Sequence, residues 1–126
     1  MNNVLINLIN AIETALTPLN LPLKPFGTFE VEDCVCYTFY NENDNGCVRN
    51  DRLELRVIAY QMDTLFEAET AIKQALVSVG DIGKISGIKS IEENGGGLMQ
   101  DTETKTVHLL MYFTIISKSE VRINEQ

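Results

Sequence analysis

The chain has few basic residues for its length. Of its 126 residues, ten are Lys or Arg and 18 are Asp or Glu, which gives a formal net charge of -8 at pH 7. A protein that neutralises nucleic-acid phosphates needs a broad basic surface, and this composition does not provide one. We therefore do not expect the chain to bind DNA directly.

The sequence also has no long uninterrupted apolar run. The most apolar stretch, residues 1–16, is broken by polar side chains and has no basic segment before it, so it is predicted to be neither a signal peptide nor a membrane span. With 44% hydrophobic residues, the chain is expected to form one domain over residues 1–126 around one core. We expect a soluble, cytoplasmic protein with no membrane partner.

Cysteine is scarce, with Cys34, Cys36 and Cys47 the only examples. Three cysteines cannot all pair within one chain, and in a cytoplasm none is expected to be oxidised. Together with His108 they match the donor set of a three-Cys, one-His zinc site. Zinc sites usually place Cys-x2-Cys on a turn, however, whereas Cys34 and Cys36 are spaced for one face of a strand. We predict reduced thiols and no metal.

No catalytic constellation is visible. His108 is the only histidine, and no acidic residue lies near it in sequence to orient it, which favours a sheet-surface residue over an acid-base catalyst. The glycine-rich stretch 94–97 follows two glutamates and leads into a strand, whereas a phosphate-binding loop leads into a helix with a Lys close behind. The sequence therefore predicts no enzyme, no catalytic residue and no cofactor.

Apolar periodicity predicts the first elements of the fold. Apolar residues recur at helical spacing from Val4 to Leu16 and stop at Pro18, which predicts a helix. Residues 19–32 contain two prolines and a glycine, so we expect an extended arm there rather than a helix or a central strand. Alternation with a period of two then predicts a strand over 34–40.

Similar patterns predict the rest of the chain. The expected elements are a hairpin loop (41–51), a strand (52–61), a helix from an N-cap at Asp63 to Gly80, a weaker strand (84–92), a loop with the apolar tip Leu98-Met99 (93–103), a strong strand (105–118) and a flexible tail (119–126). This order predicts an α+β fold, a four-stranded, mainly antiparallel sheet with two helices packed on one face. The expected core residues are Leu8, Ile12, Leu55, Val57, Ile72, Leu76, Leu109, Met111 and Phe113.

The final strand is predicted to have two different faces. One face is apolar at every second residue from Val107 to Ile115 and should lie under the helices. The other carries His108, Leu110 and Tyr112 and should be continued on a neighbouring strand by Arg56, Ile58 and Tyr60. That second face is too apolar for water and too polar for a closed core, which favours a subunit interface.

The length of the final strand supports the same interpretation. About twelve residues span on the order of 40 Å, roughly twice the usual strand length. We expect the strand to bend or to extend past its own sheet towards a neighbour. The alternative is a bulged strand in a self-contained monomer.

The order and spacing of these segments resemble the tail terminator and tail-completion proteins of long-tailed bacteriophages. The matching segments are the N-terminal amphipathic helix, the Pro-containing arm, Val35–Tyr40, Leu53–Val57, the helix around Ala68–Leu76, the Glu92–Gly97 stretch and His108–Ile116. The resemblance covers nearly the whole chain. It depends on order, spacing and the glycine-rich stretch before an aromatic strand, and it includes no catalytic signature.

The resemblance implies a structural subunit that forms a hexameric ring. Such a ring stacks on the last ring of tail tube subunits, stops tube growth and docks to the head connector or neck protein. The chain would then reside in the virion, at the head-proximal end of the tail, after assembly in the bacterial cytoplasm. DNA would pass through the ring without specific binding, which an acidic wall favours by repelling phosphates, although ordinary solubility also explains the charge.

Contacts with other subunits and with the tube are expected where apolar groups have no evident use within the chain. The candidate interface residues are Phe26, Arg56, Tyr60, Leu98, Met99 and Tyr112. Two other functions stay open. One is another head-tail component, such as a head-completion ring or a tube subunit. The other is a small-molecule-binding regulatory α+β domain, which would show a ligand pocket and stabilisation by metabolites.

Overall fold

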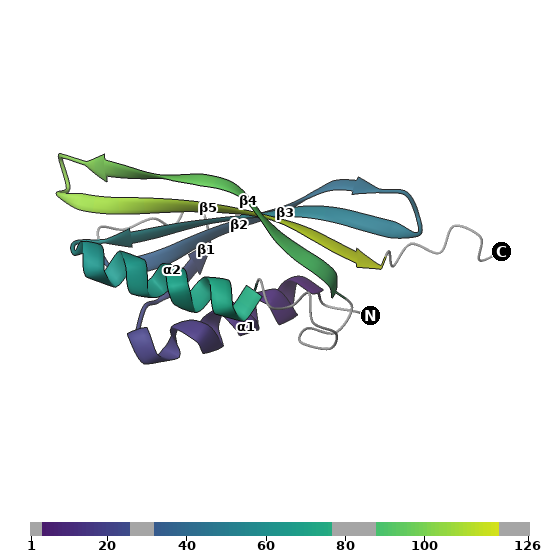
Figure 1. Cartoon of the computed structure of the whole chain (residues 1–126), viewed down its shortest axis with the longest axis horizontal. Coiled ribbons are helices and arrows are strands. Elements are labelled where there is room, and N and C mark those ends of the chain that lie inside the picture. The colour runs from purple at the N-terminus through teal and green to yellow at the C-terminus, as the bar shows by residue number, and fades with distance from the viewer. Residues whose placement is uncertain (1–3, 26–31, 77–87, 119–126) are drawn as a thin grey trace.

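The computed structural model describes residues 4–25, 32–76 and 88–118 (Figure 1). The helices are α1 (Val4–Leu16) and α2 (Met62–Leu76), with a short 3-10 turn, η1 (Thr17–Leu19), after the first. The strands are β1 (Leu23–Pro25), β2 (Cys34–Asp44), β3 (Val48–Ala59), β4 (Ile88–Asp101) and β5 (Thr106–Lys118). None of the helices in these ranges is long and apolar enough to cross a membrane.

The predicted α+β class and the order of helices and longer strands are confirmed, but the sheet has five strands rather than four. Its order is β1-β2-β3-β5-β4, with β1 parallel to β2 and the other neighbours antiparallel. The extra strand lies in the predicted arm. A segment that contains prolines can form an edge strand, because an edge strand hydrogen-bonds to a neighbour on one side only. Here the Val35 N–H donates to Pro22 O at 2.9 Å. Phe26 lies outside the described residues.

Both predicted hairpin loops were placed wrongly, because most of their residues are strand. β2 continues to Asp44 and β3 starts at Val48, so only the short turn between them remains of the 41–51 loop. Polar side chains pair across this hairpin, since Asn41 Nδ2 donates to Asn50 O at 3.1 Å and to Asp51 Oδ1 at 3.0 Å. These hydrogen bonds compensate for the low strand propensity of Asn and Asp.

The glycine-rich stretch is also part of a strand. β4 runs from Ile88 to Asp101, and its pairing with β5 shifts between Glu93 and Gly96. Gly95 and Gly96 have φ values of 95° and 147°, which lets the strand bulge and continue. Leu98 and Met99 therefore lie within β4, and the turn comes later, at residues 102–105.

The packing of both helices on one face of the sheet is confirmed (Figure 1). All nine expected core residues are buried, in a cluster that also contains Leu16, Val35, Leu53, Ala59, Leu65, Ala68, Ile91 and Ile115. The N-cap prediction for α2 is wrong by two positions, because the helix starts at Met62, which makes Gln61 the N-cap and places Asp63 in the first turn. A carboxylate there still favours the helix dipole. Gly80 lies outside the described residues.

The sheet is elongated along the direction of its strands. β3 and β5 pair along their whole lengths, from Val48 opposite Lys118 to Ala59 opposite Val107. Of the two expected outcomes, a bend or an extension past the sheet, the extension is wrong, because β3 with 12 residues and β4 with 14 are about as long as β5 with 13 and cover both of its edges. The β2–β3 turn and the β4–β5 turn consequently lie at opposite ends of the molecule (Figure 1).

Candidate assembly surface

The face of the sheet that points away from the helices, here the outer face, is the predicted half-apolar surface. Pairing places Ile58 opposite His108, Arg56 opposite Leu110 and Glu54 opposite Tyr112, so these side chains share this face, as predicted. Tyr60 lies just past the end of β3, and its N–H donates to Asp33 Oδ1 at 3.0 Å. The outer face thus mixes aromatic, aliphatic and charged side chains.

Aromatic and charged side chains are held together at the centre of this face. The guanidinium of Arg52 lies 4.6 Å from the centre of the Tyr112 ring, and Arg52 Nε donates to Glu54 Oε2 at 3.0 Å. Tyr40 OH donates to the same oxygen at 2.9 Å, and this hydrogen bond raises the pKa of Tyr40. The cluster presents two tyrosines in fixed positions, which suits a protein contact.

His108 is on the outer face, as predicted, but it is buried rather than at the surface, with 4% of its area exposed. Its Nδ1 lies 3.4 Å from Arg56 Nη1, and its Nε2 lies 2.9 Å from Thr106 Oγ1. Because a guanidinium only donates, Nδ1 accepts and the proton is on Nε2. Burial first, and the Arg56 charge second, lower the pKa of His108, which favours the neutral ring.

A shallow hollow of about 370 Å³ lies beside His108 at the β4–β5 end. It is lined by Arg56, Met99, Gln100, Asp101, Thr102, Glu103 and His108. Asp101 holds the adjacent turn, because its Oδ1 accepts from the backbone N–H groups of Glu103 at 2.9 Å and Thr104 at 3.2 Å. These hydrogen bonds lower the pKa of Asp101 and keep its carboxylate ionised.

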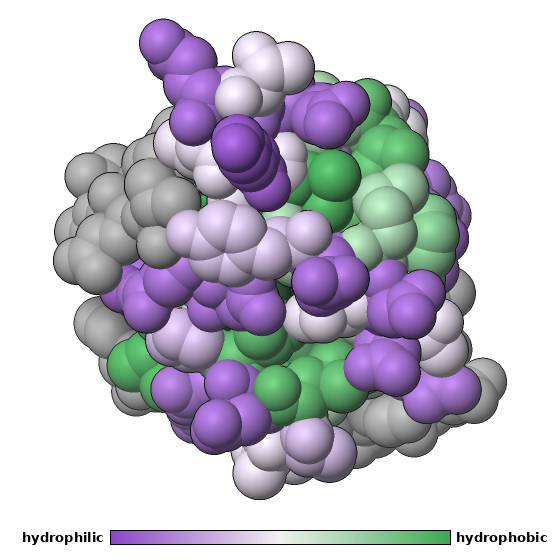
Figure 2. All heavy atoms as spheres, turned by 90° about the vertical axis from the view of Figure 1, so that its left-hand side faces the viewer, coloured by the Kyte–Doolittle hydropathy of each residue, from purple (hydrophilic) through white to green (hydrophobic). Residues whose placement is uncertain are grey.

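Most of the exposed large hydrophobic side chains of the described residues gather at this same end. Seven such residues are exposed, and five of them, Tyr60, Met62, Phe66, Leu98 and Met99, lie near the end of β3, the start of α2 and the last part of β4. Figure 2 views the molecule from this end and shows hydrophobic patches among hydrophilic side chains. Grouped exposed apolar residues of this kind mark partner-binding surfaces.

The helix contributes to this end through one stripe of residues. Met62, Phe66, Glu69 and Lys73 follow helical spacing, and Lys73 Nζ lies 3.2 Å from Glu69 Oε2 and 3.4 Å from Glu93 Oε1 of β4. The stripe therefore faces the β4 edge of the sheet.

Leu98 lies at the same end of the molecule as the apolar half of this stripe. From Lys73 back to Phe66 the helix rises about 10 Å, and from Glu93 on to Leu98 the strand advances about 15 Å, both towards the β4–β5 turn. Leu98 also pairs with the core residue Leu109, so it points to the helix side of β4. We call Met62, Phe66 and Leu98 the helix-side patch.

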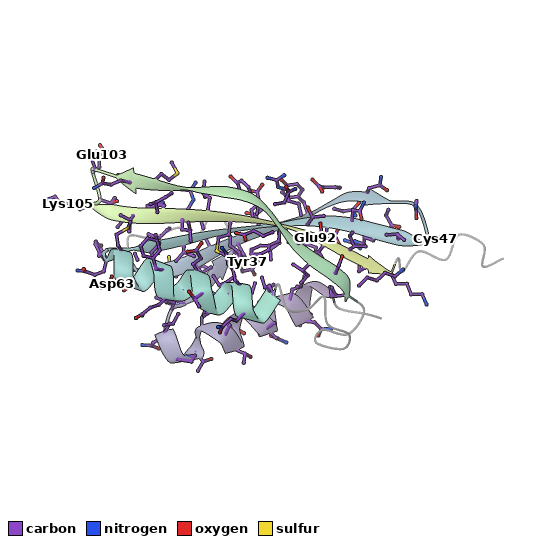
Figure 3. The ribbon with its side chains drawn as sticks, viewed as in Figure 1. Tyr37, Cys47, Asp63, Glu92, Glu103 and Lys105 are labelled. Atoms are coloured by element: carbon purple, nitrogen blue, oxygen red, sulfur yellow. The ribbon has the colours of Figure 1, made fainter. Side chains whose placement is uncertain are left out.

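The cysteines do not form the imagined zinc site. Cys34 and Cys36 are buried next to Ile58, and burial raises the pKa of Cys34 to about 12 and also raises that of Cys36. Cys47 lies in the β2–β3 turn, at the end opposite Glu103 and Lys105 (Figure 3). Within residues 4–25, 32–76 and 88–118, no three potential ligands are close enough together to hold a metal ion.

The structure brings together only part of the predicted interface. Tyr60, Leu98 and Met99 are about half exposed at one end, at 48%, 52% and 48%, while Tyr112 and Arg56 are half-buried on the outer face. Sequence reasoning missed Met62 and Phe66. Their spacing of four residues beside the core stripe of α2 was the signal that could have found them.

No family model and no curated protein matches this chain. A solved structure does resemble it, a chain from the virion of a native gene transfer agent (GTA) particle. The TM-score is 0.62, the sequence identity is 11%, and the match covers 89% of this chain and 92% of that chain. At this identity the likeness shows a shared fold over nearly the whole of both chains.

Proposed function

We propose that the chain is a structural protein of a phage-like particle and that its copies form a hexameric ring. The ring would cap the tail tube, end tube polymerisation and join the tail to the head connector. The observation that carries this proposal is the shared fold with a chain of a gene transfer agent virion, which extends over 89% of this chain. The order and spacing of the sequence segments support the narrower assignment to a tail terminator.

The surface supports an assembly role. Five exposed hydrophobic side chains gather at one end, and two tyrosines are held on the outer face by Arg52 and Glu54. Such surfaces suit protein partners, which here would be further copies of the chain, the tail tube protein and the head connector or neck protein. The proposal requires no cofactor and no catalysis.

The proposed position is the head-proximal end of the tail, where DNA passes through the ring. A net charge of -8 favours passage, because negative charge repels phosphates and leaves the genome without specific contacts. Because the similar chain belongs to a whole virion, the likeness supports a head-completion ring or a tube subunit as a second candidate. Binding of the purified chain to tail tube protein, and separately to connector protein, would discriminate between them.

Deletion of the gene from a particle-producing strain tests the proposal. We expect tails that are overlong or unjoined to heads when particles are imaged, and normal joined tails when the wild-type chain is supplied in trans. Normal-length, head-attached tails in the deletion strain would refute the tail terminator assignment. Defects confined to unfilled heads would instead favour a head-completion ring.

A further inference from the structure

The helix-side patch has an acidic border. Asp63 and Glu67 follow Met62 and Phe66 directly on α2, and both carboxylates are on exposed residues. Figure 3 shows that Asp63 and Glu103 lie at the same end of the molecule. The patch and its border together would suit a partner surface that combines aliphatic and basic side chains.

The opposite end of the sheet carries a surface that combines aliphatic and basic side chains. Lys118 ends β5 opposite Val48, and Lys89 lies near the start of β4, where Ile88 pairs with Ser117. Both lysines are exposed, whereas Val48 and Ile116 are partly exposed. Val48, Ile116 and Lys118 lie on the outer face, and we call Lys89 and Lys118, together with Val48 and Ile116, the lysine corner.

The other charged residues that the structure describes near the lysine corner are Arg49, Glu42, Asp44 and Glu92. Arg49 is neutralised locally, because its Nε donates to both carboxylate oxygens of the buried Asp51 at 2.9 Å. The acidic residues Glu42 and Asp44 belong to β2. In the sheet order, β3 separates β2 from Lys118 on β5, and β3 and β5 separate β2 from Lys89 on β4. Glu92 lies further along β4, opposite Thr114.

The two surfaces cannot meet within one molecule. They lie at opposite ends of a twelve-residue β3–β5 pairing, which spans on the order of 40 Å. Two different, complementary surfaces at opposite ends of a subunit produce head-to-tail contacts, and such contacts close into rings when the rotation between subunits permits.

We infer that the helix-side patch of one copy docks on the lysine corner of the next copy. Asp63 and Glu67 face Lys89 and Lys118 in this contact, and Met62, Phe66 and Leu98 pack on the aliphatic residues of the corner. The occupant is a second copy of this chain because the complementary surface is present on the chain itself. The inference deepens the proposed ring and depends on it, since it names the contact that closes the ring.

Charge reversal at each end tests the contact. One variant carries Asp63→Lys and Glu67→Lys, and a second carries Lys89→Glu and Lys118→Glu. Each variant alone presents like charges at both ends, so its self-association in sedimentation experiments should fall about tenfold or more below that of the wild-type chain. An equimolar mixture of the two should recover association, because each acidic end then meets a basic end.

The apolar part of the contact has a matched control. Phe66→Asp changes a helix residue with 47% exposure inside the patch, and Ile6→Asp changes a helix residue with 52% exposure on α1, outside it. Both variants should retain the circular dichroism spectrum of the wild-type chain. Only Phe66→Asp should weaken self-association, and wild-type association should weaken with added salt because exposed charges are screened.

Several outcomes would overturn the inference. These are reversal variants that associate as well as the wild-type chain, a mixture that does not recover, equal effects of Phe66→Asp and Ile6→Asp, and a wild-type chain that stays monomeric up to about 1 mM. Patch variants that associate normally but no longer bind tube protein would assign the patch to the tube instead. None of these results decides the ring at the tail end, which the deletion experiment tests separately.

Discussion

Replacing Gly96 with alanine would test the bulge that allows β4 to run the length of the sheet. Gly96 has a φ of 147°, a conformation that costs an L-residue about 1 to 3 kcal/mol. A Cβ at this position would also lie 2.2 Å from the carbonyl oxygen of Leu110. That oxygen belongs to the backbone of β5, which is paired on both sides, so it cannot move without separating strands.

Overpacking of this kind adds about 1 to 3 kcal/mol, so Gly96→Ala should lower the free energy of unfolding by roughly 2 to 6 kcal/mol. Gly97→Ala is the matched control, because no atom lies within 4 Å of its added Cβ and its φ is not in the positive region. We expect the control to change stability by less than about 1 kcal/mol. Urea unfolding followed by far-UV circular dichroism measures both. Equal stabilities for the two variants would show that the bulge does not require glycine at this position.

Further predictions concern the core, the outer face, pH and metal. Phe113→Ala should cost about 3 to 5 kcal/mol in urea unfolding, because the side chain is fully buried; a loss below about 1 kcal/mol would contradict its core position. Tyr112→Asp should fold but give overlong or unjoined tails in imaged particles, whereas Ile6→Asp should give normal ones. The pKa of His108 is lowered by burial and by Arg56, against an opposing effect of Asp101, so the unfolded chain binds more protons below about pH 6.5. Stability should therefore fall as the pH drops below about 6.5, and His108→Gln should reduce that slope. Elemental analysis after gentle purification should find no stoichiometric zinc, and one zinc per chain that is lost on Cys34→Ser would refute this.

The helices and the core could be predicted because their signal is periodic and local. Leu8 and Ile12 on α1, and Ile72 and Leu76 on α2, follow helical spacing, and all four are fully buried. The alternation in β5 likewise placed Leu109 and Phe113 under the helices. A repeated apolar pattern of this length leaves few other ways to bury the same side chains.

The ends of the strands could not be predicted from composition. Asn41 and Asp51 are poor strand formers, but they hydrogen-bond to each other across the β2–β3 hairpin. That stabilisation depends on which residues come to lie opposite, which the sequence does not state. The same limit applies to β1, where Leu23–Pro25 is a strand only because the edge of β2 lies beside it.

The candidate surface was predictable in its residue types but not in its position. Exposed Leu98 and Met99 suggested partner contacts, and the assignment of both to a loop tip was wrong because the bulge at Gly96 keeps them in β4. Met62 and Phe66 were missed because a methionine and a phenylalanine beside a core stripe resemble core residues. Only the packing direction of α2, fixed by Lys73 and Glu93, shows that they face outwards along the β4 edge.

The position of Leu98 and Met99 in a strand changes what they can bind. Consecutive strand residues point to opposite faces, and here Leu98 is level with Leu109 on the helix side while Met99 is level with His108 on the outer side. One flat partner surface cannot bury both, so the β4–β5 hairpin is suited to two partners at once. If the neighbouring copy occupies the helix side, then the outer side, with Met99, Tyr60 and the hollow beside His108, remains for the tube or the head. A structural joint needs this separation, because it must bind its own copies and a different protein without either excluding the other.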